Sequence, residues 1–128
     1  MIPRFRAWDR TLKTMYEADD IMYIDFEEKE ICVKTLFFER ASRYDFDDIV
    51  LMQSTGLTDK NGKEIFEGDI IDSYGVGLSG IIEFRADLGA FVSTLIEYHN
   101  FERLCNVANS AKIIGNIWEN LELAEVGS

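Results

Sequence analysis

The chain has 128 residues, 47% of them hydrophobic, so it can bury a core without metals or disulfides and is too apolar to be disordered. Its 13 Lys and Arg stand against 24 Asp and Glu, and the formal net charge of −11 repels phosphate backbones and anionic membrane surfaces. The sequence opens without an apolar signal core and has no segment that fits a membrane helix, so we expect a cytoplasmic protein.

Residues 1–48 are predicted to form an N-terminal β subdomain. Alternating apolar and polar side chains, or β-branched and aromatic ones, are typical of strands. The strands expected here span residues 2–8, 15–16, 21–26 and 31–38. A polar connection is expected at 9–13. Residues 39–48 are charged and lack clean periodicity, so we expect them to form a surface loop that joins the two halves.

Residues 49–128 are predicted to form a small β-barrel, because short apolar segments alternate with glycine turns. The strands expected here span residues 49–53, 69–74, 80–85, 90–96 and 112–118. Asn61-Gly62 favours a type I′ turn, in which both residues have positive φ. Gly68 and Asp69 form a second predicted turn, and Gly115 lies in the closing strand. Whether residues 99–108 form one or two helical turns is left open. Residues 121–128 are expected to be a tail.

The cysteines and the single histidine do not form a pattern that predicts a cofactor or a metal site. Cys32 and Cys105 lie far apart without CxxC spacing, so we expect two free, buried thiols. The single histidine, His99, cannot complete a structural zinc site, which wants four ligands. It also lacks a nucleophile or an orienting acid at a recognisable spacing. We therefore predict no catalytic residue.

Two further sequence patterns are better explained as a connecting loop and as solvated surfaces than as functional sites. Gly75, Gly77 and Gly80 have the spacing of a dinucleotide fingerprint, but that motif must precede a helix and the next segment is β-like. The acidic clusters at 19–20, 27–30 and 45–48 could serve acid–base catalysis or hold a divalent cation. None of them has the spacing of a calcium loop, and charge runs are usually solvated faces.

Aromatic residues of the second half offer a possible groove, although a small barrel buries most of its large apolar side chains. The aromatic residues considered are Phe66, Tyr74, Phe84, Phe91, Tyr98, Phe101 and Trp118. Among them, Tyr74, Tyr98 and Trp118 are the predicted partner surface.

The segment at residues 51–71, LMQSTGLTDKNGKEIFEGDII, resembles the signature of the YopX-like proteins, which occur in phages and prophages of mainly Gram-positive bacteria. The opening FRAWD at 5–9 and the closing IGNIWEN at 114–120 agree with it, while 17–48 and 86–110 match loosely. The resemblance implies a C-terminal SH3-like barrel and a phage-encoded protein in the cytoplasm of a bacterial host. It implies no reaction, cofactor or catalytic residue.

These observations predict a non-enzymatic accessory protein that binds another protein, or itself, through strand edges and an aromatic face. The alternative is a nucleic-acid-associated or DNA-mimicking regulator, because small barrels often bind nucleic acid. The charge of −11 opposes direct binding to nucleic acid. A third hypothesis, a metal-dependent hydrolase that uses the clustered acids, lacks a histidine pair or a recognisable acidic motif.

Overall fold

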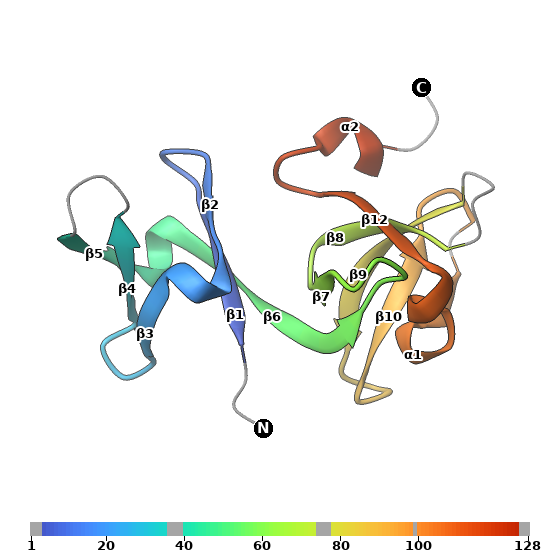
Figure 1. Ribbon diagram of the computed structural model, residues 1–128, viewed down its shortest axis with the longest axis horizontal. Helices are drawn as coiled ribbons and strands as arrows, with labels where there is room; N and C mark the ends of the chain where they lie inside the picture. The colour runs from blue at the N-terminus through green and yellow to red at the C-terminus, as the bar shows by residue number, and fades with distance from the viewer. Residues whose placement is uncertain (1–3, 36–39, 74–77, 99, 126–128) are drawn as a thin grey trace. The chain divides into compact units, whose positions relative to one another are not determined.

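The computed structural model describes residues 4–35, 40–73, 78–98 and 100–125 (Figure 1). The chain is mainly β, which confirms the predicted fold class. It divides into two compact units, Met1–Gln53 and Ser54–Ser128. The boundary that the sequence suggests, between residues 48 and 49, falls where the long strand β6 begins. No described helix is long and apolar enough to cross a membrane.

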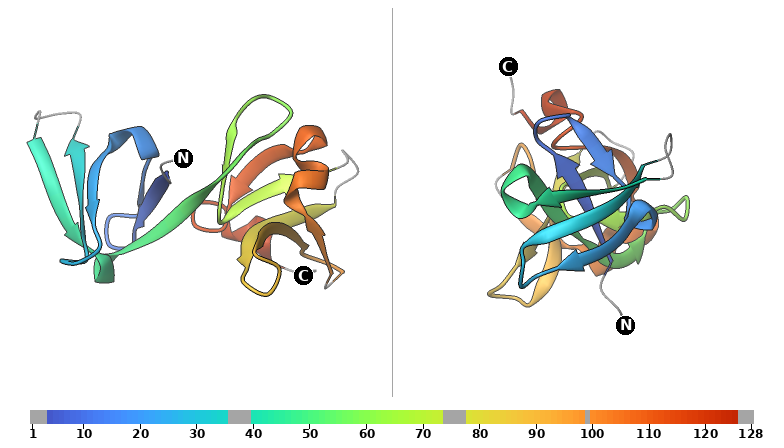
Figure 2. Two further views of the ribbon diagram at one scale, coloured as in Figure 1. Left: turned by 90° about the horizontal axis from the view of Figure 1, so that it is seen from below. Right: turned by 90° about the vertical axis from the view of Figure 1, so that its left-hand side faces the viewer.

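The first unit contains two antiparallel sets of strands (Figures 1 and 2). Its strands are β1 (Phe5–Asp9), β2 (Thr14–Tyr16), β3 (Ile21–Asp25), β4 (Glu30–Thr35), β5 (Arg40–Asp45) and the first half of β6 (Ile49–Thr58). Strand β1 pairs with β2 on one side and with β6 on the other, whereas β4 lies between β3 and β5. Strand β3 is therefore an edge of its three-stranded sheet.

The core of the first unit joins these two sets of strands. Its buried members are Ala7, Ile31, Val33 and Ile49. Tyr16 and Tyr44 pack beside them as stacked rings, with centroids 5.2 Å apart. The alternation over residues 2–8 is typical of a strand with one buried face, but Arg6 and Trp8 are buried as well as Ala7. An arginine has an apolar stem, so counting it as a polar position underestimates its burial.

The prediction of a connecting loop over residues 39–48 is also wrong. Residues 40–45 form β5, which pairs with the whole of β4, and a 3-10 helix follows at Phe46–Asp48. The inward positions Ser42 and Tyr44 alternate with the exposed Arg43 and Asp45. The period of two was present, but the polar Ser42 at an inward position and the surrounding charges hid it.

The second unit is a curled antiparallel sheet with short helices (Figure 1). Its strands are the second half of β6, then β7 (Glu64–Phe66), β8 (Asp69–Asp72), β9 (Ser79–Arg85), β10 (Ala90–Leu95), β11 (Phe101–Arg103) and β12 (Lys112–Asn116). The order in the five-stranded sheet is β11-β10-β9-β8-β12, and β6 pairs with β7. This curled sheet is consistent with the SH3-like barrel that the resemblance implies.

Helical turns close the core of the second unit. Helix α1 (Leu104–Val107) packs against β10 and β11, and a 3-10 helix follows at Ala108–Ser110. The buried core residues are Ile65, Ile71, Ile82, Leu104, Val107, Ala108 and Ala111. Two expectations need correction here: residues 101–103 form the strand β11, and the expected tail contains helix α2 (Leu121–Ala124).

The turn between β6 and β7 differs from the predicted type I′ turn. Gly62 has φ +81°, but Asn61 is not among the described residues with positive φ. The Gly62 N–H donates to the Asp59 carbonyl (3.0 Å) and the Asp59 N–H donates to the Lys63 carbonyl (2.8 Å), which defines a three-residue loop with glycine last. The Asp59 carboxylate accepts the Asn61 N–H at 2.9 Å, and this side-chain bond selects the longer loop.

The turn between β7 and β8 depends on Gly68, whose φ is +84°. Its N–H donates to the Ile82 carbonyl, and its own carbonyl accepts the Ile117 N–H, both at 2.9 Å. The buried Asp69 accepts the Phe66 N–H at 2.8 Å and holds the turn. Gly115 leaves no room for a side chain, because an added Cβ would lie 2.5 Å from Asn120 Oδ1.

We predict that Gly62→Val and Gly68→Val each lower the free energy of unfolding by about 1–3 kcal/mol, the cost of a β-branched residue at positive φ. At Gly62 no atom lies within 4 Å of an added Cβ, so the loss there measures backbone strain alone. Thr58→Val, at an exposed position of β6, is the matched control. Denaturant unfolding curves measure the effect, and two glycine variants as stable as the control would contradict it.

Candidate functional site

The predicted partner surface is only partly described by the structure. Tyr74 lies outside the described residues, as does His99. Tyr98 is 58% exposed and Trp118 is half-buried. Tyr98 lines a small pocket, and Trp118 is not part of its lining. Of the two predicted residues that the structure describes, only Tyr98 lines this pocket.

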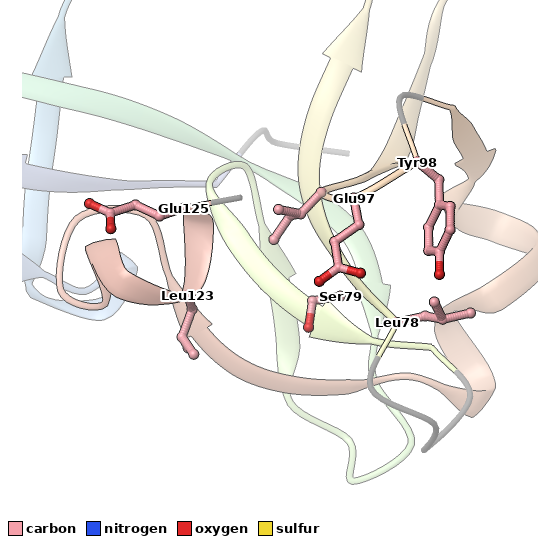
Figure 3. A pocket seen from close by; sticks show the side chains of 7 residues that line it. Leu78, Ser79, Glu97, Tyr98, Leu123 and Glu125 are labelled. Carbon is pink, nitrogen blue, oxygen red and sulfur yellow. The ribbon is translucent and has the colours of Figure 1, made fainter. Parts of the chain in front are cut away.

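The pocket beside Tyr98 is small and acidic (Figure 3). Its volume is about 70 Å³, well below the roughly 300–1,000 Å³ of typical ligand pockets. It is lined by Leu78, Ser79, Ile96, Glu97, Tyr98, Leu123 and Glu125. In Figure 3 the Tyr98 ring points toward Leu78, and the Glu97 carboxylate points toward Ser79. This volume is closer to the space for a few water molecules than to that of a typical ligand pocket.

The other exposed aromatic rings of the second unit, Phe84 at 50% and Phe101 at 39%, each contact one neighbouring side chain. The guanidinium of Arg85 lies 4.4 Å from the centre of the Phe101 ring. Asp87 accepts two hydrogen bonds from the same guanidinium, at 2.9 and 3.1 Å. Phe84 meets Phe91 edge to face, with centroids 5.2 Å apart. These contacts make the second unit a weaker candidate for an apolar binding surface.

The first unit contains a larger apolar groove that the sequence did not reveal. The β3 groove, as we call it, has a volume of about 390 Å³. It is lined by Arg4, Phe5, Ala18, Ile21, Met22, Tyr23, Ile24 and Phe26. Met22, Tyr23 and Phe26 are 56%, 41% and 61% exposed. The apolar run at 21–26 indicated a strand, but only the strand order shows that it is an edge.

Contacts within the first unit fix the shape of the β3 groove. Phe26 lies between two other rings and meets both edge to face, with centroids 6.0 Å from Phe5 and 5.8 Å from Phe46. The register against β4 shifts between Ile21 and Tyr23, so β3 has a bulge at Met22. Bulges at sheet edges change the direction of side chains. Met22 and Tyr23 are consequently both exposed on the edge strand.

The acidic clusters are not arranged as metal sites in the part of the chain that is described, where no three His, Cys, Asp or Glu lie together in a suitable way. Asp25 accepts the N–H groups of Glu27 and Glu28, both at 3.0 Å, and so closes the turn between β3 and β4. Asp47 and Asp48 are exposed. Both thiols are free, but only Cys32 is buried; the prediction that Cys105 is buried is wrong.

The buried carboxylate of Asp59 accepts hydrogen bonds from backbone N–H groups and so has a structural role. Its Oδ1 accepts the N–H groups of Asn61 and Lys63 at 2.9 Å, and its Oδ2 accepts that of Ile113 at 3.0 Å. Burial is the largest single influence on the pKa of Asp59, and it raises the pKa because it opposes ionisation. The three N–H groups and the Lys63 charge together outweigh it, so the pKa of Asp59 lies below its usual range. The ionised side chain ties the β6–β7 hairpin to β12.

The fold and the turns define a β protein of two small units, and the comparisons place it in a family. The family model described as YopX protein matches residues 4–125, and the chain belongs to this family. The resemblance that the sequence showed is thereby confirmed.

Two solved structures are similar over nearly their whole lengths. Protein EF1440 from Enterococcus faecalis is 30% identical, with a TM-score of 0.66, over 98% of this chain and 99% of that one. Protein YopX from Bacillus subtilis is 19% identical, with a TM-score of 0.62, over 98% of each chain, and it shares the fold. The comparison with curated proteins finds no match.

We predict that Asp59→Asn lowers the free energy of unfolding at neutral pH by about 1–3 kcal/mol, because an amide group cannot replace all the acceptor bonds of the carboxylate. The folded-state pKa lies below the ordinary 3.8. The stabilisation is therefore complete above pH 3.8 and is lost as the pH falls through the folded-state pKa. The stability gap between wild type and variant should be constant near neutrality and shrink on acidification.

Urea unfolding across this pH range tests the Asp59 prediction. Asp47→Asn, at an exposed carboxylate, is the control and should show no comparable gap at neutral pH. A gap that is absent at neutral pH, or that widens as the pH falls, would contradict the assigned role.

Proposed function

We propose that the protein is a non-enzymatic interaction protein, which binds another protein or a second copy of itself through the β3 groove. The observation that carries this proposal is the exposure of Met22 and Tyr23 on the edge strand β3, and of Phe26 in the turn that follows it, beside the groove. Fully burying an apolar side chain of this size gains about 1.5–3 kcal/mol. A cluster of three such side chains is therefore a plausible energetic centre for an interface.

The edge position of β3 supports the same proposal. Groups on an edge strand have no neighbouring strand on one side, so a partner can approach them directly. In the second unit Phe84 and Phe101 are 50% and 39% exposed, but each contacts one neighbour, Phe91 or Arg85, and neither lines the pocket beside Tyr98. From the family resemblance, we include in the proposal that the protein is a phage-encoded accessory protein of the host cytoplasm.

A second candidate function is favoured by charge. The net charge of −11 is compatible with a surface that imitates DNA and occupies a DNA-binding protein. In this second candidate function the partner is still a protein. It differs from the leading proposal in the surface used, since it requires exposed acids and not the apolar side chains of the β3 groove.

We predict that a photo-crosslinking residue placed at Met22 captures a protein from a bacterial lysate, or a second copy of the chain. The same residue at Leu12, which is 62% exposed in the same unit and does not line the groove, should capture neither. Light scattering on the purified protein separates self-association from capture. A monomer that forms no adduct specific to position 22 would contradict the proposal, and adducts at both positions would indicate nonspecific contact.

We also predict no direct binding to DNA or RNA. Nonspecific affinity for nucleic acid comes from clustered Lys and Arg, and this chain has 13 such residues among 24 acids. Lowering the salt concentration should strengthen the repulsion rather than relieve it. Mobility-shift titrations with mixed-sequence DNA and RNA test this. Affinity near micromolar that falls steeply with salt would favour the nucleic-acid alternative.

A further inference from the structure

The charges around β3 indicate what kind of partner fits the groove. Acids lie on both sides of the strand: Glu17, Asp19 and Asp20 precede it, and Asp25, Glu27, Glu28 and Glu30 follow from its last residue onward. Lys29 is the only cation between residues 17 and 30. Arg4, which itself lines the groove, is bonded to Asp19 at 3.2 Å, and Arg43 is close enough to influence Tyr23. The surroundings of the groove are therefore predominantly acidic.

We propose that the β3 groove binds a basic segment of another protein, in which an apolar anchor side chain is flanked by Lys or Arg. This inference rests on the proposed function and specifies its partner. The apolar lining supplies the contact for the anchor, and the acids at both ends attract the flanking cations. Complementary charge of this kind speeds association and selects among partners more than it adds raw affinity.

A second copy of the chain is a poor occupant of the same groove. If two β3 strands met in an antiparallel pair, the acids before the strand in one copy would face the acids after it in the other. Like charges placed opposite each other oppose pairing, and each copy also carries a net charge of −11. The charges that would oppose a second copy are the ones that attract a basic segment.

The bulge in β3 indicates how the segment binds. A partner that simply added a strand would need a regular row of N–H and C=O groups, and the register shift between Ile21 and Tyr23 interrupts the ladder. The bulge nevertheless leaves the side chains of Met22 and Tyr23 exposed beside the groove. Insertion of an anchor side chain therefore fits the geometry better than extended strand addition.

The test is a selection from a library of short random peptides with the full-length protein as bait, followed by affinity measurements on the enriched peptides. Peptides retained by the Met22→Ser, Tyr23→Ser variant are removed by counter-selection. We expect the remaining peptides to carry net positive charge around an aromatic or aliphatic residue. Their affinity should fall about tenfold with Met22→Ser, as for an interface anchor, and stay unchanged with the matched variant Leu12→Ser.

Charge reversal separates the electrostatic part of the inference. The double variant Glu27→Lys, Glu28→Lys should slow association and weaken binding about tenfold. Glu122→Lys, Glu125→Lys changes the net charge equally at exposed positions of the second unit and should have a much smaller effect. Added salt should weaken binding to wild type. An equal loss in both double variants would show an effect of overall charge and overturn the local role of the acids.

The outcomes distinguish this inference from the function on which it rests. Enriched peptides that are neutral or acidic, yet depend on Met22, would overturn the basic partner and leave the β3 groove as an interaction site. If the basic peptides of the selection all bind the Met22→Ser, Tyr23→Ser variant as well as wild type, and are therefore lost in counter-selection, charge attraction acts without an anchor, which also overturns the inference. A selection that yields no Met22-dependent peptide would overturn both the inference and the assignment of the groove.

Discussion

Backbone N–H groups at the tight turns of this protein donate to side-chain oxygens, and most of the fold depends on these bonds. Asp9 accepts two N–H groups and the Tyr16 hydroxyl, Asp69 accepts one N–H, and Asn116 accepts two. Asp59 goes further, since its third bond reaches a strand 54 residues away. Each acceptor is buried, so water cannot replace it, and a donor left without its partner costs about 1–3 kcal/mol.

These acceptors give the segments that identify the family a structural role. Asp9 ends the opening segment, Asp59 and Asp69 lie in the central one, and Asn116 lies in the closing one. Each segment encodes a turn whose geometry is set by a side chain and, at Gly62 and Gly68, by positive φ. Except for Arg4 and Phe5, the residues that line the β3 groove lie within 17–48, where the resemblance is loose. The residues that fix the fold and the residues proposed to select a partner are therefore different sets.

The same distinction explains what the sequence could predict. The hairpins and the turn glycines follow from local patterns, and they were found. The type of turn at Asn61 was missed because it depends on the Asp59 carboxylate, and β5 was missed because charges masked its alternation. The β3 groove was missed for a third reason. Whether an apolar strand such as 21–25 is central or at an edge depends on pairing between distant segments, which the local pattern does not contain.

An exposed apolar edge would ordinarily invite pairing between copies, and β3 carries two features that oppose it. The bulge at Met22 interrupts the hydrogen-bonding row, and the acids at both ends repel a second acidic edge. Neither feature covers Met22, Tyr23 or Phe26. Buried acids such as Asp59 are bound to backbone, while exposed acids such as Glu27 and Glu28 set the surface field. The acidic composition thus contributes to the fold in the interior and, in our proposal, to the choice of partner at the surface.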